Sequence, residues 1–179
     1  PGGRLIINNG SLIEDAEFAV DIQNHTSTNP ILEIDETIFN RNYFGVNIVN
    51  YHQNTATYPF EITNTVFTSR YLTFNASSWP APSDLETIIN TGTLSERYDM
   101  DSYNTIGRKA PYNTNSICVG LYLEDVGDLN SGTYFNFELN GDDGNGTFNL
   151  FDAVAFPILG FNSNISATNN VFQLIPKTG

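Results

Sequence analysis

Cysteine is nearly absent from the sequence, with Cys118 as its single example. One cysteine excludes a disulfide within the chain, so packing alone has to stabilise the fold. Cys118 lies in the apolar segment 117–121, where a free cysteine behaves as a small buried hydrophobic side chain. Long apolar runs are missing too, because no segment approaches the ~20 apolar residues of a membrane-spanning helix. The sequence therefore predicts no membrane span.

Basic residues are also scarce. The chain has 7 Lys and Arg against 20 Asp and Glu, which gives a formal net charge of −13. Nucleic acid is not expected as a partner, because phosphate binding requires a basic surface. A strongly anionic polysaccharide would be repelled on average, although a local basic patch can override that repulsion. The low basic content favours a secreted or cell-surface protein.

A repeated pattern of apolar and polar residues is what the sequence does contain. Segments 32–39 and 60–67 align position for position. Their offset falls within the fixed period of about 20–45 residues that is typical of proteins built from stacked repeats. The alternating pattern indicates β-strands, each lying about 4.8 Å from its copy in the next repeat. The sequence thus predicts an all-β parallel β-helix, in which Ile34 stacks on Ile62 and Phe39 stacks on Phe67.

The pattern is interrupted in the middle of the chain. Segment 68–74 resembles the strand expected at 46–49 and is interpreted as its copy in the next repeat. Segment 75–116 then shows no repeat and is rich in Pro, Asp, Ser, Thr and Tyr, whereas 167–172 copies 62–67. We therefore expect one β-helix region over 1–179 with a long loop insertion at 75–116. Insertions in repeat proteins leave from one face, which is often the binding face.

Asparagine is unusually common, with 24 examples in 179 residues. It tolerates left-handed backbone conformations and forms side-chain turn bonds. We expect Asn-Thr and Asp-Ala steps at the corners between short strands, where side-chain amides bond to the backbone of the next repeat. A solenoid also needs a polar cap at each end, and neither end of this chain has an obvious one. We therefore expect the chain to be part of a larger polypeptide or assembly.

Three segments resemble a known type of repeat. Residues 10–16, followed by 37–40 and 44–48, resemble the right-handed parallel β-helix repeats, or pectate-lyase-like solenoids, in large secreted surface proteins of Bacteroidetes-type bacteria. The chain departs from this pattern at 40–43, where a simple Asn-Asn corner is usual. The resemblance implies a right-handed solenoid, in agreement with the general preference for right-handed crossovers. It also implies a secreted or cell-surface location and says little about activity.

Three functions are compatible with such a solenoid. The first is a structural or adhesive role, in which a stiff bacterial surface protein presents its loops for glycan or protein binding. The second is a polysaccharide-degrading enzyme, either a lyase or a glycoside hydrolase, because enzymes of both kinds share this shape. The third is a passive spacer without a ligand.

Aromatic residues of the insertion are the first candidate binding site. Tyr and Trp side chains on a rigid face stack well on sugar rings and on protein partners. They can equally well cover the flank of the solenoid beneath a long loop. The candidate ligand-binding residues of the insertion are Trp79, Tyr98, Tyr103 and Tyr112.

Two arginines are a second candidate site. Arg41 and Arg70 are separated by about one period of the repeat, so they can stack on one face as a small basic ladder. A polysaccharide lyase needs a basic residue to remove the proton next to a uronate carboxylate. The alternative is a pair of surface residues whose stems pack on neighbouring tyrosines.

Acidic residues suggest only a weak chemical site. Asp142 and Asp143 form an adjacent acidic pair in the glycine-rich segment 140–146, with Asn145 close by. Their oxygens can serve as calcium ligands, although calcium requires about 6–8 of them, and an acidic turn without a metal is the alternative. A hydrolase needs one carboxyl as acid and another as base, but the other motifs typical of β-helix hydrolases are missing. We therefore predict no catalytic residues and no cofactor other than calcium.

Overall fold

Most of the chain outside the central insertion is described by the computed structural model. It covers residues 4–8, 10–27, 31–53, 60–71, 93–94, 119–127, 137–140 and 148–173. All regular elements in these ranges are β-strands, so the prediction of an all-β chain is confirmed for them. These ranges also contain no helix that is long and apolar enough to cross a membrane.

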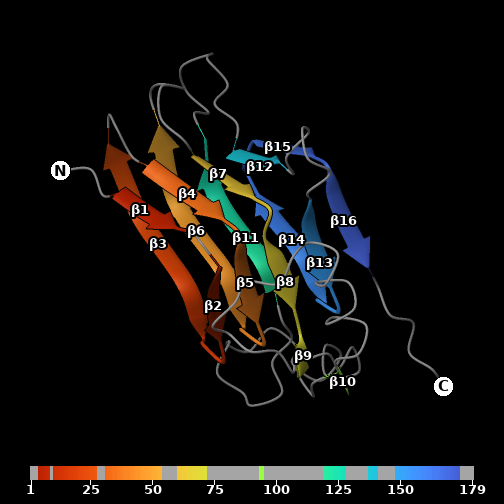
Figure 1. Cartoon of the computed structure of the whole chain (residues 1–179). Helices are drawn as coiled ribbons and strands as arrows, with labels where there is room; N and C mark the ends of the chain where they lie inside the picture. Colours follow the sequence, from red (N-terminus) through yellow and green to blue (C-terminus); the bar gives the residue numbers. More distant parts are fainter. Residues whose placement is uncertain are drawn as a thin grey trace, which may run out of the picture.

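The strands form three parallel sheets, two of five strands and one of four (Figure 1). Sheet A consists, in spatial order, of β1 (Arg4–Ile7), β4 (Ile31–Asp35), β7 (Phe60–Thr63), β12 (Phe137–Asn140) and β15 (Ile165–Thr168). Sheet B consists of β2 (Ser11–Glu14), β5 (Thr37–Asn40), β8 (Val66–Thr68), β13 (Asn149–Asp152) and β16 (Asn170–Gln173). Sheet C consists of β3 (Phe18–Ser27), β6 (Phe44–Gln53), β11 (Val119–Val126) and β14 (Phe156–Phe161). A separate antiparallel pair is formed by β9 (Arg70–Tyr71) and β10 (Thr93–Leu94).

The chain visits the sheets in the order A, B, C and then begins again. Strands β1 to β3 form the first repeat, β4 to β6 the second, β7, β8 and β11 the third, and β12 to β14 the fourth. Strands β15 and β16 belong to a fifth. Leu32 pairs with Phe60, and Phe137 pairs with Ile165 by the same offset in sequence. Each strand therefore lies beside its copy from the neighbouring repeat, which is compatible with a parallel β-helix.

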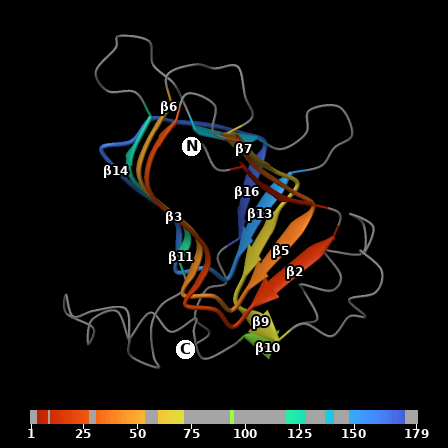
Figure 2. The ribbon, with the colours of Figure 1, turned by 90° about the vertical axis from the view of Figure 1, so that its left-hand side faces the viewer.

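The three sheets surround one apolar core (Figure 2). Alternate side chains of each strand point to this core, as the two-residue period of a strand requires. Leu32 of sheet A, Phe39 of sheet B and Val46 of sheet C belong to the same buried cluster. Ile34 lies opposite Ile62 and both are fully buried, which confirms this predicted stack.

Four phenylalanines form a continuous stack along sheet B, which we call the Phe ladder. The ring centroids of Phe39 and Phe67 lie 5.0 Å apart, those of Phe67 and Phe151 4.8 Å, and those of Phe151 and Phe172 5.1 Å. The interplanar angles do not exceed 15°. Such offset stacks contribute about 0.5–1.5 kcal/mol per pair beyond the burial of apolar area. The predicted contact between Phe39 and Phe67 is thus confirmed as part of a longer series.

Sheet C approaches the Phe ladder so closely that it needs glycine at two positions. A Cβ atom on Gly45 would lie 2.6 Å from the Gly120 carbonyl oxygen and 2.8 Å from the Phe67 ring. A Cβ atom on Gly120 would lie 2.7 Å from the Pro157 carbonyl oxygen and 2.9 Å from the Phe151 ring. The two glycines allow the sheet C backbone to lie directly against the rings.

One sequence prediction is wrong. The place of the third repeat in sheet C is taken by β11, in which Val119 pairs with Phe44, and not by segment 68–74. Strand β11 begins Val-Gly-Leu, in the same order as the Phe-Gly-Val of β6, so both strands have glycine next to the ladder. Within segment 68–74, Arg70–Tyr71 pairs instead with β10.

Corners between strands depend on single residues with left-handed backbone conformation. The corner from sheet A to sheet B uses Gly10, Glu36, Asn64 and Asn169, all with positive φ. The corner from sheet B to sheet C uses Asp15, Arg41 and Ala153, and the bend of sheet C uses Asn50, Asp125 and Asn162. Asparagine, which adopts this conformation at low cost, is the commonest residue type among them. The high asparagine content therefore has a structural reason at these corners.

Side-chain amides connect the repeats at these corners, but they bind the backbone of the preceding repeat and do not belong to the predicted Asn-Thr and Asp-Ala steps. The Asn149 side chain accepts a hydrogen bond from the Thr65 backbone N–H at 2.9 Å and donates to the Ile62 carbonyl at 3.1 Å. The Asn42 side chain accepts from the Ala16 backbone N–H and donates to the Ile13 carbonyl, both at 2.9 Å. Each amide satisfies backbone groups whose burial without a hydrogen bond would be costly.

Gly120→Ala is expected to lower the free energy of unfolding by about 1–3 kcal/mol, because the new methyl group overlaps a backbone oxygen that cannot move aside. Urea denaturation would measure this loss. Gly160→Ala is the matched control, since its Cβ would meet only the flexible Ile165 Cδ1 at 3.2 Å. Equal losses in the two variants would contradict the close approach of sheet C to the ladder.

Candidate functional site

The structure places some of the predicted site residues and leaves others outside the described part. Arg41 and Arg70 are described, and both lie at the corner from sheet B to sheet C. The remaining candidates lie outside the described residues, so their predicted roles stay predictions: Trp79, Tyr98, Tyr103, Tyr112, Asp142, Asp143 and Asn145.

Arg41 binds the carboxylates of the preceding repeat. Its Nε donates to Asp15 Oδ1 at 3.1 Å, and its Nη2 donates to Asp15 Oδ2 at 2.5 Å and to Glu14 Oε2 at 3.1 Å. Its Nη1 donates to the Arg70 backbone carbonyl at 3.3 Å. The guanidinium therefore connects three repeats at one corner.

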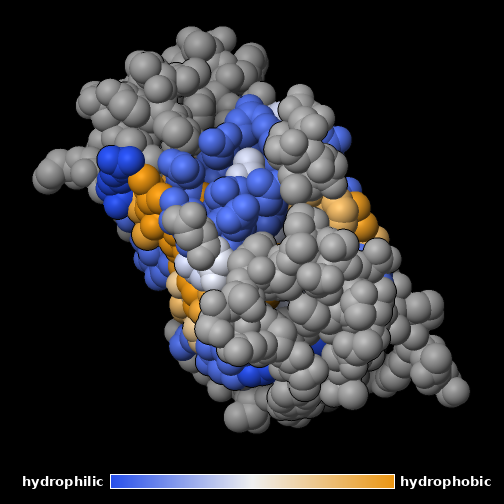
Figure 3. All heavy atoms as spheres, in the orientation of Figure 1, coloured by the Kyte–Doolittle hydropathy of each residue, from blue (hydrophilic) through white to orange (hydrophobic). Residues whose placement is uncertain are grey.

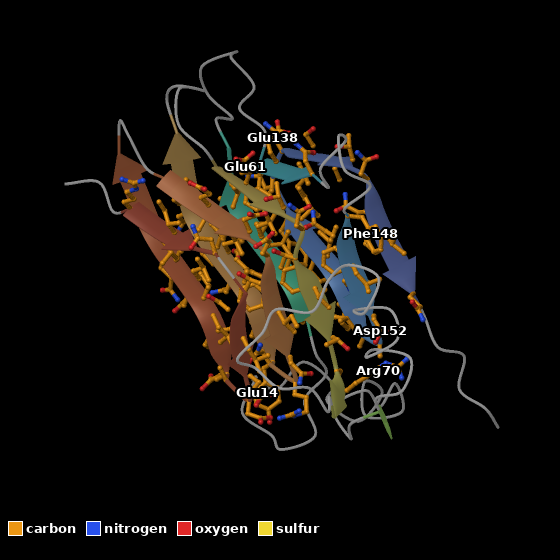
Figure 4. The ribbon with its side chains drawn as sticks, in the orientation of Figure 1. Glu14, Glu61, Arg70, Glu138, Phe148 and Asp152 are labelled. Carbon is orange, nitrogen blue, oxygen red and sulfur yellow. The ribbon has the colours of Figure 1, made fainter. Side chains whose placement is uncertain are left out.

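Arg70 forms a buried ion pair with the following repeat. Its Nε and Nη2 donate to the two oxygens of Asp152, at 2.5 Å and 3.2 Å. Thr68 Oγ1 donates to the same carboxylate at 3.0 Å. Arg70 is only 5% exposed and Asp152 is fully buried. Figure 4 shows the two residues next to each other. A bidentate contact of this kind suits the planar guanidinium.

The two arginines thus lie in adjacent repeats, as the spacing predicts, and each binds a carboxylate of the repeat on its outer side. We call this set the charged corner: Glu14, Asp15, Arg41, Arg70 and Asp152. Because each guanidinium is already bound to a carboxylate, the contacts of the charged corner stabilise the stack of repeats. Binding of a ligand by Arg41 and Arg70 stays a prediction.

A row of carboxylates on the outer face of sheet A was not found from the sequence. Glu33 pairs in register with Glu61, and Glu61 pairs with Glu138, so three consecutive strands present glutamate at the same position. We call these three residues the carboxylate ladder. Figure 3 shows hydrophilic side chains gathered over sheet A, and Figure 4 shows Glu61 and Glu138 on adjacent strands. The alignment of 32–39 with 60–67 already places Glu33 and Glu61 at equivalent positions, so the sequence contained the information needed to find two members of this row.

Glu61, the central member of the carboxylate ladder, has a shifted pKa. Burial raises the pKa of Glu61 above its ordinary value of 4.5, and the neighbouring charges of Glu33, Glu138 and Asp35 raise this pKa further. Neighbouring side chains hold two of these acids in place. Asn140 donates to Glu138 Oε2 at 2.8 Å, and Thr63 donates to Asp35 Oδ1 at 2.7 Å.

The carboxylate ladder has two chemical capacities. A carboxyl group whose pKa is raised by like charges can hold a proton and return it, as general acid catalysis requires. A row of carboxylates also attracts cationic groups. The described residues contain no group of three His, Cys, Asp or Glu side chains placed to hold a metal ion. Burial and the neighbouring charges raise the pKa of Glu61, which is the direction that proton donation requires.

Aromatic side chains gather on the outer face of sheet C. The rings of Phe18 and Phe44 stack at 4.9 Å, and Tyr122 lies edge-on to Phe44 at 5.9 Å. Tyr122 also lies 5.7 Å from Phe161 and donates its hydroxyl to Glu124 at 2.6 Å. Burial, followed by this hydrogen bond and the charge of Glu124, raises the pKa of Tyr122 to about 12. The tyrosine is therefore neutral at physiological pH and acts as a hydrogen-bond donor.

Asp152→Ala is expected to lower the free energy of unfolding by about 3–5 kcal/mol, because it removes the carboxylate that compensates the buried charge of Arg70. Chemical denaturation followed by circular dichroism would measure this loss. The matched control is Glu14→Ala, whose half-exposed ion pair with Arg41 contributes no more than about 1 kcal/mol. Similar losses in both variants would show that the ion pair of Arg70 with Asp152 contributes no more to the free energy of unfolding than the ion pair of Arg41 does.

Glu61→Gln is expected to stabilise the fold near pH 7, by about 0.5 kcal/mol, through removal of like charges on adjacent strands. Folding raises the pKa of this carboxyl, so the folded state holds the proton more tightly than the unfolded chain does. The free energy of unfolding therefore falls as the pH rises from about 4.5 through the raised pKa. Urea denaturation at pH 4 and pH 7 measures the difference between the variant and the parent chain.

The gain should be present at pH 7 and absent at pH 4, where the carboxyl is already protonated. Glu17→Gln, a charge removal outside the carboxylate ladder, is the control for the loss of one negative charge. An equal gain from Glu61→Gln at both pH values would contradict the effect of neighbouring charges.

Comparison with known proteins gives no relative. No protein-family model matches the chain, and no curated protein sequence or solved structure matches it. The function has to be argued from the arrangement of the residues themselves.

Proposed function

We propose that this chain is a section of a right-handed parallel β-helix that serves as a structural and adhesive scaffold. In this proposal it belongs to a secreted or cell-surface bacterial protein and presents loops for glycan or protein binding. The observation that carries the proposal is the continuous register of the three parallel sheets around the Phe ladder. Repeats that stack in register build a rigid rod, and loops attached to a rigid rod are well placed for binding.

The position of the long insertion supports this role. Glu61 pairs with Glu138, so the chain between these two partners is much longer than the chain between Glu33 and Glu61. The extra residues lie mainly between β8 of sheet B and β11 of sheet C. Strand β11 nevertheless pairs with β6 and β14 in full register. The repeat therefore accepts a long segment at one corner without loss of its stacking.

The composition of the insertion supports a choice of ligand class for this proposal. Segment 75–116 contains the aromatic residues Trp79, Tyr98, Tyr103 and Tyr112. Aromatic rings bind the apolar faces of sugars and the apolar groups of protein partners. The net charge of −13 disfavours polyanionic ligands. We therefore propose a neutral glycan or a protein as the ligand.

Trp79→Ala is expected to weaken retention of the chain on an immobilised neutral polysaccharide at least about tenfold, which corresponds to about 1.4 kcal/mol. Affinity electrophoresis against a panel of neutral and acidic polysaccharides, with and without calcium, measures this retention. Phe148→Ala is the matched control, because Phe148 is an exposed aromatic residue outside the insertion. An equal loss with Phe148→Ala would indicate unspecific adhesion of exposed rings, and no retention on any polymer would leave a protein partner.

A polysaccharide-degrading enzyme is the second candidate, and the carboxylate ladder is the observation that favours it. Glycoside hydrolases use two carboxyl groups, one of which has a raised pKa and donates a proton. Glu61 has a raised pKa and lies between two other glutamates. Release of shortened products in the same assay, abolished by Glu61→Gln but not by Glu17→Gln, would replace the scaffold proposal by this one.

A further inference from the structure

Two aromatic rings lie beside a carboxylate on the outer face of sheet C. Phe161 of β14 is 53% exposed, the largest exposed fraction of any large hydrophobic side chain among the described residues. Its ring centroid lies 5.7 Å from that of Tyr122 on the neighbouring strand β11 (Figure 1). Phe161 also pairs in register with Glu124 of β11. Exposed apolar surface next to polar groups is typical of an interaction site.

This face of sheet C points away from the core. Leu121 and Leu123, which precede and follow Tyr122 in β11, are fully buried in the core cluster. Side chains alternate along a strand, so Tyr122 and Glu124 lie on the opposite, outer side. A further strand beside β14 would lie in the plane of the sheet, about 4.8 Å away, and would leave this face open.

The carboxylate at this position is already oriented. The Tyr122 hydroxyl donates to Glu124 Oε2 at 2.6 Å, and the Tyr122 ring lies edge-on to Phe44 at 5.9 Å. The second oxygen, Glu124 Oε1, accepts no hydrogen bond from the described residues. A ligand can therefore bind to Oε1 without displacing Tyr122.

The charge of this face selects the ligand. The four strands of sheet C contain the carboxylates Asp21, Glu124 and Asp125 and contain no Lys or Arg. Asp21 lies on the same face, because it pairs with Asn47, which in turn pairs with Tyr122. A positively charged ligand is complementary to such a face, whereas an anionic one is repelled.

An arginine side chain matches both parts of this site. Its planar guanidinium stacks on aromatic rings and donates parallel hydrogen bonds to a carboxylate. A ring attracts a cation that lies within about 6 Å of its centroid, and the rings of Tyr122 and Phe161 are 5.7 Å apart. One guanidinium can therefore contact both rings and bind Glu124. A neutral sugar lacks the charge that this face favours.

We propose that the outer face of sheet C, at Tyr122, Glu124 and Phe161, binds an arginine side chain of a protein partner. The guanidinium stacks on the Phe161 ring and donates to Glu124 Oε1. Arginine and tyrosine are both enriched in protein interfaces, in agreement with such a contact. The site goes beyond the proposed scaffold role and does not depend on binding by the insertion, which the Trp79→Ala assay tests separately.

A titration of the intact chain with N-acetyl-arginine amide, followed by backbone-amide NMR, tests the proposal. The expected result is a set of chemical-shift changes concentrated at Tyr122, Glu124 and Phe161. N-acetyl-citrulline amide has a similar shape but no charge, so it is the matched control probe and should give no such changes. Changes of the same size with both probes, or changes that avoid sheet C, overturn the proposal.

Substitutions measure the two contacts separately. Phe161→Ala and Glu124→Gln are each expected to raise the dissociation constant of the arginine probe at least about threefold, since each removes one contact with the guanidinium. Phe148→Ala removes an exposed ring outside sheet C, and Glu36→Gln removes an exposed charge at the corner from sheet A to sheet B. Neither control should change the constant. Equal effects of all four variants overturn the proposal, and circular dichroism confirms that each variant is folded.

Glucosamine distinguishes a protein partner from a glycan. It combines a positive charge with a sugar ring, so it is the corresponding probe for a polysaccharide that carries amino groups. We expect smaller shift changes at Tyr122 and Phe161 with glucosamine than with the arginine probe, because glucosamine has no planar cationic group. Larger changes with glucosamine at equal concentration overturn the proposal and assign the site to an amino-glycan.

Discussion

Stacking of each strand on its copy in register is the interaction on which the rest of the structure depends. A shift by one residue would turn every core side chain of that strand to the solvent, because side chains alternate between the two faces. The Phe ladder makes such a shift costly, since it would separate Phe67 from both Phe39 and Phe151. Gly45 and Gly120 are part of the same constraint, because a Cβ atom at either position would overlap a ring of the ladder and a backbone oxygen.

Stacking in register also places equivalent residues of successive repeats side by side, whether these residues attract or repel each other. On the inner face it stacks phenylalanines, and on the outer face of sheet A it stacks Glu33, Glu61 and Glu138. The charged corner offsets such repulsion, because Arg41 binds carboxylates of the repeat before it and Arg70 binds the carboxylate of the repeat after it. The carboxylate ladder keeps like charges on adjacent strands. An unfavourable arrangement of this kind on a regular surface is a reason to look for function there.

Self-similarity made the stacked sheets predictable, because segments 32–39 and 60–67 carry similar residues at the positions that face the core. The sheet C strand of the third repeat was harder to assign, because a long segment separates β11 from β8 and interrupts the period of the repeat. The ion pair of Arg70 with Asp152 was missed for the same reason, since 82 residues separate its partners. The binding role predicted for the aromatic residues of the insertion stays a prediction, because these residues lie outside the described part of the chain.

The long third repeat has a consequence for the order in which the molecule folds. Asp35 and Thr63, which connect the second repeat to the third, are 28 residues apart. Thr68 and Asp152, which connect the third repeat to the fourth, are 84 residues apart. Contacts between distant residues form more slowly, because closure of a longer loop loses more chain entropy. The strands from β1 to β8 can therefore assemble early, and so can those from β12 to β16. Joining of these two halves across the third repeat is then the slow step, and the rod is completed from its middle.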